Sequence, residues 1–152
     1  MTTRGARAGA RGGGANGRMN KSPGLLFDTG ALIDLYRGRP VMQTYLRALL
    51  NQTRIGYISV ISEAELWRGI KPGEVERHQA ILASFTGLDL DSQMARVAGE
   101  WMQKYEAQGL GWMDALIAAT AKQAGLKLLT RDVRLAKLLA PEIEFEVYQL
   151  NV

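Results

Sequence analysis

Residues 24–37 read GLLFDTGALIDLYR, a short apolar run that ends in the carboxylate of Asp28 and passes directly into a helical pattern. A run of this length, bounded by a polar residue, is typical of a buried strand. Apolar residues at helical spacing then follow from about residue 29 to residue 37. Because a buried strand followed at once by a helix is the repeating unit of a parallel sheet, this stretch predicts an α/β fold.

The rest of the chain repeats this alternation as far as about residue 150. Further short strands are expected at 55–59, 88–90, 127–130 and 145–150. Helical periodicity occupies the segments between them, over about 40–51, 62–70, 74–85, 92–107, 113–124 and 132–139. This pattern predicts a three-layer α/β/α sandwich with a central, mainly parallel five-stranded sheet. Ligands of such sheets gather at the carboxyl ends of the strands, so any chemistry is expected there.

Residues 1–22 differ from the rest in composition. They are rich in Gly, Ala and Arg, and we expect them to be disordered ahead of a single domain over residues 24–150. Five of the 19 basic residues lie in this segment, which holds no acid, leaving 14 basic against 15 acidic residues beyond it. The domain is therefore nearly neutral, and charge alone does not identify a nucleic-acid partner. An RNA-holding tail is one interpretation of the segment, but a start at Met19 is favoured because nothing before it could bury a core.

Composition limits the chemistry that is open to the chain. With no Cys and a single His, it cannot build a disulfide, a thiolate site or a multi-His metal site. A metal ion would have to be held by carboxylates and water, which favours Mg²⁺ or Mn²⁺. No apolar stretch is long enough to span a membrane, and the lack of Cys fits the reducing cytoplasm, where we expect the protein.

Four acids follow expected strands or open expected helices: Asp28, Glu65, Asp114 and Asp132. Such a set suits hydrolysis of a phosphodiester, since carboxylates hold a divalent cation and the cation acidifies a water. Each acid also has a purely structural explanation. Ser62 and Glu65 have the spacing of a capping box. Asp114 lies in a first helical turn, and Asp28 and Asp132 could each be an N-cap. Spacing alone does not show that the four side chains meet.

Four segments resemble the motifs of PIN domains, in the order and on the elements where that family has them. They read LLFDTGALID (25–34), SVISEAELWRG (59–69), MDALIAATA (113–121) and LLTRD (128–132). Any one of them would be weak evidence, but together they span essentially all of residues 24–150. The set is most similar to the compact VapC-type toxins of bacterial VapBC toxin–antitoxin systems. The resemblance therefore implies a PIN-like fold and a metal-dependent endoribonuclease.

The resemblance also implies roles for individual residues. The acids that would bind Mg²⁺ or Mn²⁺ and hydrolyse RNA are Asp28, Glu65, Asp114 and Asp132. Thr29 and Thr130 match positions whose hydroxyls help to order that cluster. Many VapC-like sequences have Asn in place of Asp132 and an acid where this chain has Leu135, so a direct-ligand role for Asp132 stays open. Arg131 adjoins the expected site and could hold a phosphate by charge-assisted hydrogen bonds.

Partners and alternatives follow from the same resemblance. It implies an RNA substrate, a VapB-like antitoxin that covers the site, and a homodimer. A housekeeping RNA-processing nuclease and a catalytically silent PIN-fold binding module remain as alternatives. A haloacid-dehalogenase-like phosphatase would need a second Asp where Gly30 stands. A receiver domain would need an acid pair at the first strand and a Lys after the fifth strand, and the chain has neither.

Other polar and aromatic residues are expected to have structural roles or none. Asp34 and His78 are interpreted as surface residues. Glu63 is interpreted as a solvated acid, because it points about 200° around the helix from Glu65 and only one of the two can face a site. The tryptophans are expected to fill a core or a subunit interface rather than to stack on bases: Trp67, Trp101 and Trp112.

Overall fold

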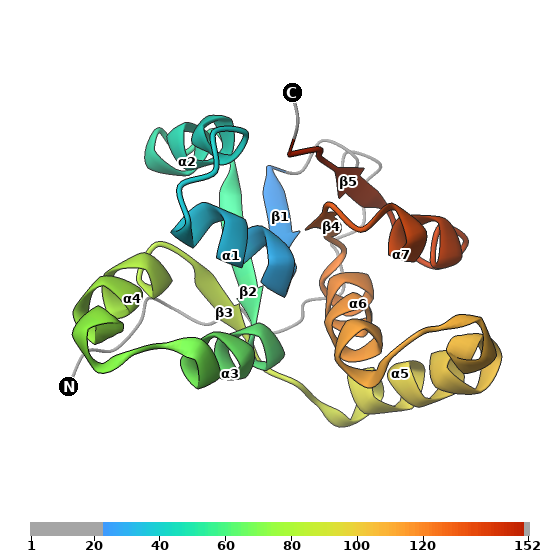
Figure 1. Cartoon of the computed structure of the whole chain (residues 1–152). Coiled ribbons are helices and arrows are strands. Elements are labelled where there is room, and N and C mark those ends of the chain that lie inside the picture. Colours follow the sequence, from blue (N-terminus) through green and yellow to red (C-terminus); the bar gives the residue numbers. More distant parts are fainter. Residues whose placement is uncertain (1–22, 151–152) are drawn as a thin grey trace.

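The computed structural model describes residues 23–150, so the expected disorder of residues 1–22 lies outside the described residues. Its centre is a five-stranded sheet in which all neighbouring strands are parallel. The strand order across the sheet is β3-β2-β1-β4-β5 (Figure 1). The strands are β1 Gly24–Phe27, β2 Ile55–Ser59, β3 Thr86–Leu88, β4 Lys127–Thr130 and β5 Phe145–Val147. The predicted parallel architecture is confirmed.

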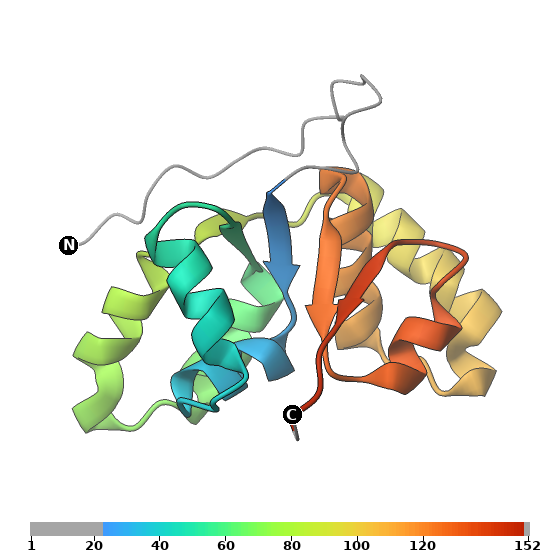
Figure 2. The same cartoon turned by 90° about the horizontal axis from the view of Figure 1, so that it is seen from above.

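Helices connect the strands and cover both faces of the sheet, as Figure 2 shows from above. They are α1 Thr29–Tyr36, α2 Met42–Leu50, α3 Val60–Gly69, α4 Val75–Leu82, α5 Ser92–Tyr105, α6 Trp112–Ala124 and α7 Val133–Leu138, with 3-10 turns at Pro72–Glu74 and Glu106–Gln108. Within residues 23–150, none of these helices combines the length and the apolar character that crossing a membrane requires.

Strand β1 is buried on both faces, and its side chains alternate between two hydrophobic cores. Leu25 and Phe27 belong to the core beneath α1, α2 and α4. Leu26 belongs to the core beneath α5, α6 and α7. Because successive side chains of a strand point to opposite faces, a central strand of a covered sheet needs apolar residues at every position. This explains the unbroken apolar run of β1.

Parallel pairing brings the carboxyl ends of β1, β2 and β4 to one edge of the sheet. Phe27 pairs with Leu129, and the backbone N–H of Asp28 donates to the Leu129 carbonyl at 3.1 Å. Beyond β5, the N–H of Tyr148 donates to the Thr130 carbonyl at 3.2 Å. The chain continues from β1 toward β2 on one side, whereas β4 and β5 lie on the other side of β1. The carboxyl edge between β1 and β4 is therefore the point at which the strand order reverses, and parallel sheets bind ligands at such points.

Several element boundaries differ from the prediction, among them those of α3 and β3. Helix α3 begins at Val60, and Ser59 is its N-cap, with a side chain that accepts a backbone hydrogen bond at 3.1 Å. The capping box expected of Ser62 and Glu65 is therefore wrong, because both residues lie inside the helix. The third strand ends at Leu88, earlier than expected, because its pairing with β2 ends there.

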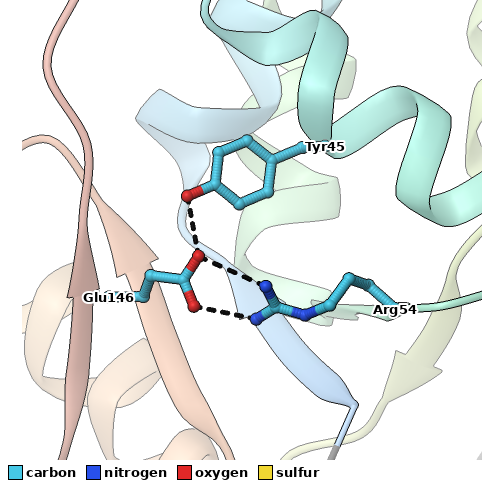
Figure 3. Close-up of polar contacts among 3 residues, drawn as sticks. All are labelled: Tyr45, Arg54 and Glu146. Carbon is cyan, nitrogen blue, oxygen red and sulfur yellow. Dashed lines mark hydrogen bonds and ion pairs between the residues drawn. The ribbon is translucent and has the colours of Figure 1, made fainter.

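A polar contact joins the edge strand β5 to two other elements (Figure 3). Glu146 on β5 accepts hydrogen bonds from the Tyr45 hydroxyl of α2 at 2.7 Å and from Arg54 Nη2, just before β2, at 2.8 Å. Burial alone would raise the pKa of Glu146, but the bonds from Arg54 and Tyr45 outweigh burial and hold that pKa below its usual range. The contact thus attaches the outermost strand to a helix of one covering layer.

Candidate active site

Asp28 leaves strand β1 and starts helix α1. Its backbone is extended, and its Oδ1 accepts a hydrogen bond from the Ala31 N–H at 2.7 Å. It is therefore an N-cap, as its structural explanation predicted. Asp28 is only 9 % exposed. Capping is compatible with a place in a site, because the cap uses one carboxylate oxygen and a second oxygen remains.

The end of strand β4 lies beside Asp28. Thr130 is fully buried, and its hydroxyl donates to the Asp28 carboxylate and accepts from the N–H of Asp132 at 3.0 Å. Asp132 in turn caps α7, since its Oδ1 accepts from the Leu135 N–H at 3.0 Å. The side chain of Asp132 is exposed. One threonine therefore connects a buried acid with an exposed acid.

Helix α3 directs Glu65 toward the start of α1. The hydroxyl of Thr29 donates to Glu65 Oε1 at 2.5 Å and lies 2.9 Å from the hydroxyl of Ser62. Ser62 precedes Glu65 by three residues, so the two share one helix face. The contact between Ser62 and Thr29 was not predicted, although the helical spacing of Ser62 and Glu65 was the available clue.

The electrostatics of Asp28 show which acids lie near it. Burial raises the pKa of Asp28 to about 6, against the hydrogen bonds from Thr130 and Ala31, which lower it. The negative charges of Asp114 and Asp132 raise it further. A buried carboxylate next to two other acids resists ionisation, and the site would be stabilised by any added positive charge.

Asp114, in the first turn of α6, is the fourth acid of the group. Its pKa is raised first by burial and then by the charges of Asp132 and Glu65. The charge of Arg134 opposes the rise. Arg134 was not predicted as part of the site, although it lies only two residues after Asp132 in the sequence.

The structure thus brings the four predicted acids to one edge of the sheet and couples their charges. Within residues 23–150, however, no three Asp, Glu or His side chains are arranged as ligands of a single ion. Three of the four acids make hydrogen bonds of their own. Asp28 and Asp132 are turned toward the helix ends that they cap, and Glu65 is turned toward Thr29.

The interpretation of Asp34 as a surface residue is wrong. Asp34 is fully buried, and its Oδ2 accepts from the Tyr148 hydroxyl at 2.6 Å and pairs with Nε of Arg131 at 3.2 Å. The pKa of Tyr148 is raised by burial, by Asp34 and also by the charge of Asp28. This buried group therefore adjoins the four acids. The periodicity of α1 did not reveal it, because both partners of Asp34 are far away in the sequence.

The interpretation of His78 as a solvated residue is also wrong. His78 is 1 % exposed, its Nδ1 lies 2.7 Å from the Tyr36 hydroxyl, and its ring meets that of Trp67 edge-on. Burial lowers the pKa of His78, while the charge of Glu63 opposes that change. Glu63 is itself half-buried rather than solvated. These residues form a packed contact between α1, α3 and α4.

The three tryptophans divide between the core and the surface. Trp101 is 5 % exposed and lies in the core beneath α5 and α6, as predicted. Trp67 and Trp112 are 42 % and 52 % exposed, so the core expectation is wrong for both. Their place in a subunit interface stays a prediction.

Comparison with known proteins gives a consistent set of similarities. The PIN domain family matches residues 25–139, a range that contains all four acids. Ribonuclease VapC10 of Mycobacterium tuberculosis is 35 % identical over 113 residues, covering 72 % of this chain and 83 % of that protein. Ribonuclease VapC19 of the same organism is 30 % identical over 111 residues, covering 72 % and 89 %. The DNA-bound VapBC structure from Salmonella typhimurium has a TM-score of 0.69 and 26 % identity, covering 81 % of this chain and 96 % of that chain.

Proposed function

Because the chain belongs to the PIN-domain family, we propose that it is a divalent-metal-dependent endoribonuclease that hydrolyses RNA phosphodiester bonds. One observation carries the proposal: Asp28 and Asp114 lie at the carboxyl edge of the sheet, where burial and then the charges of neighbouring acids raise the pKa values of both. The names of the similar ribonucleases support RNA as the substrate class.

The chemistry of the donor set fits a hard cation, Mg²⁺ or Mn²⁺. The acids that would hold it are Asp28, Glu65, Asp114 and Asp132. Their oxygens are the ligands that such ions prefer, and a bound cation would offset both the burial of Asp28 and the repulsion among the acids. When bound, the ion supplies an acidified water and positive charge for the leaving oxygen.

Other residues of the chain orient these acids. Thr130 holds Asp28 through its hydroxyl and Asp132 through the N–H of that residue. Thr29 holds Glu65. We therefore assign Thr29 and Thr130 as positioning residues. Arg131 lies next to Asp132 with a half-exposed side chain, and it would bind a phosphate of the substrate.

We further propose that the protein is the toxin of a VapBC-type pair. The solved structures that it resembles are toxin–antitoxin complexes, among them one from Klebsiella pneumoniae and the Salmonella VapBC complex. A VapB-like antitoxin would cover the carboxyl edge of the sheet, and a homodimer would be the functional unit. Co-purification with the product of a neighbouring gene is the expected result. A free protein that is active and tolerated by its host would contradict the toxin assignment.

Cleavage of total RNA tests the nuclease proposal. Purified protein is incubated with Mg²⁺ or Mn²⁺, and in parallel with EDTA. Discrete fragments are expected with the wild type, and none with EDTA, with Asp28→Asn or with Asp114→Asn. Glu100→Gln is the matched control, because Glu100 is exposed on α5 and pairs only with the neighbouring Arg96 in the described part of the chain. If folded wild-type protein without antitoxin leaves the RNA intact, the nuclease proposal is contradicted, and the alternative of a catalytically silent PIN-fold binding module remains.

A further inference from the structure

Asp34 is a buried charge that the proposed catalytic group does not use. It lies in the middle of α1 and is fully buried. Burial of an ionised carboxylate is costly unless partners compensate for the lost water. Both recorded partners, Tyr148 and Arg131, bind Oδ2, whereas Oδ1 is buried without a hydrogen bond among the described residues. Such a placement lowers the stability of the fold, which would be unusual for a residue with no role beyond packing.

The ion pair with Asp34 holds one side of the Arg131 guanidinium, while the side chain as a whole stays partly exposed. The contact to Asp34 is made by Nε, at 3.2 Å, and the Arg131 side chain is 45 % exposed. A guanidinium that is anchored through Nε still presents the donors of its two terminal nitrogens in one plane. That planar pair matches two oxygens of a phosphate.

The backbone places this side chain beside the acidic group. Arg131 lies between Thr130, which binds Asp28, and Asp132. Tyr148 is held at the same edge, since its N–H donates to the Thr130 carbonyl. The ends of β4 and β5 and the middle of α1 thus converge on one guanidinium.

We propose that Asp34 and Tyr148 hold Arg131 as a fixed arm that binds a backbone phosphate of the RNA next to the four acids. The inference rests on the proposed function in one respect, namely that RNA is the substrate. Arg131 would contact the RNA directly. Asp34 and Tyr148 would act through Arg131 and are positioning residues.

RNA binding at several salt concentrations tests the arm without cleavage. The dissociation constant of a single-stranded RNA oligonucleotide is measured in EDTA at KCl concentrations from about 50 to 200 mM. The slope of the logarithm of the binding constant against the logarithm of the salt concentration reports how many phosphate contacts the protein makes. Arg131→Ala is expected to weaken binding about tenfold and to reduce the salt slope by about 0.7, the value for one phosphate contact on a single strand.

Asp34→Asn is the decisive variant, because it keeps the side-chain volume and an acceptor for Tyr148 while it removes the charge that anchors Arg131. We expect weaker binding in the same direction as Arg131→Ala. The double variant is expected to bind no more weakly than Arg131→Ala alone, since the arm can be lost only once. If Asp34 only stabilises the fold and does not position Arg131, Asp34→Asn would leave the salt dependence of RNA binding unchanged.

Two further variants complete the test. Arg96→Ala removes an exposed charge on α5 and should leave binding close to that of the wild type. Arg131→Lys keeps the charge but loses the Nε anchor and the planar pair, so it should bind nearly as weakly as Arg131→Ala. Should Asp34→Asn fail to fold, Tyr148→Phe takes its place, because it removes the hydroxyl that donates to Asp34 Oδ2 and should weaken RNA binding in the same direction.

The inference is overturned if Arg131→Ala or Arg131→Lys binds RNA as the wild type does. It is also overturned if folded Asp34→Asn keeps the wild-type affinity and slope. Neither result can be confused with failure of the proposed nuclease. That failure would appear separately, as RNA left intact by the wild type in the presence of Mg²⁺.

Discussion

At the scale of the residue, Asp28 combines two roles in one carboxylate. It caps α1 through Oδ1 and faces Asp114 and Asp132 closely enough for their charges to raise its pKa. Caps normally stabilise a protein, but burial and like charge work against this one. The folded chain therefore tolerates an acid here at a cost in stability, as expected of residues placed for chemistry rather than for folding.

Replacement of Asp28 measures that cost. The pKa of Asp28 is raised from 3.8 to about 6, so the folded chain holds this proton more tightly than the unfolded chain does. Stability should therefore fall as pH rises from about 4 to about 6. Asp28→Asn keeps the cap and does not ionise. We expect it to raise the free energy of unfolding by roughly 3 kcal/mol at pH 7 in EDTA, and by nothing below about pH 4.

Urea unfolding at a series of pH values checks this expectation. Asp132→Asn is a useful control, because Asp132 is exposed and also caps a helix. It should change stability much less. Equal stability of Asp28→Asn and the wild type at pH 7 would show that burial and repulsion do not strain this site. Added Mg²⁺ should stabilise the wild type more than Asp28→Asn.

At the scale of the element, β2 packs closely against the side chains of Phe85 and Leu49. Gly56 lies on β2, and a Cβ at this position would lie 2.8 Å from the ring of Phe85 and 3.0 Å from Leu49 Cδ2. The Phe85 ring cannot easily move away, because it is 3 % exposed and packs edge-on against Phe27. Glycine is required here by space rather than by backbone conformation.

Gly56→Ala is therefore expected to destabilise the protein by about 1 to 3 kcal/mol through overpacking. The matched control is Gly99→Ala within α5, where a new Cβ would meet nothing within 4 Å. Since alanine favours helix over glycine, that control should stabilise the protein by about 0.5 to 1 kcal/mol. Denaturant midpoints of the two variants provide the measurement. Shifts of the same sign would contradict the packing explanation.

At the scale of the whole molecule, the edge strand β5 is held by contacts between residues far apart in sequence. It is only three residues long, so its own ladder contributes little. Glu146 links it to Tyr45 of α2 and to Arg54, just before β2 (Figure 3). The same end of the chain carries Tyr148, which holds Asp34. The position of β5 therefore bears on both the sheet and the proposed arm.

Glu146→Gln tests this attachment. Because the pKa of Glu146 is held below its usual 4.5, its contribution to stability should be present above about pH 4.5 and should be lost as pH falls through the folded value. Half-buried ion pairs contribute modestly, so we expect a loss of about 1 kcal/mol at pH 7. Thermal unfolding of Glu146→Gln and the wild type at pH 7 and pH 3.5 shows whether the loss depends on the charge of Glu146. A loss that is equally large at both values would mean that shape, not charge, matters.

The amino-acid order alone was sufficient for the plan of the fold and for the positions of the proposed acids along it. Short unbroken apolar runs that lead directly into a helical pattern, such as Gly24–Phe27, are typical of central strands between two helical layers. Placing Asp28, Asp114 and Asp132 next to expected strand ends or helix starts required only local periodicity. Such features depend on neighbours within a few residues, which is the range over which a sequence pattern carries information.

Tertiary structure decided what surrounds the acids. The burial of Asp34 depends on Tyr148 and Arg131, and that of His78 depends on Tyr36 and Trp67. Each of these contacts forms only when separate strands and helices pack together. A helical repeat reports which residues share a face, but it does not report which distant side chain that face meets. The local pattern therefore determined on which elements the proposed acids lie, and long-range packing determined their electrostatics and their neighbours.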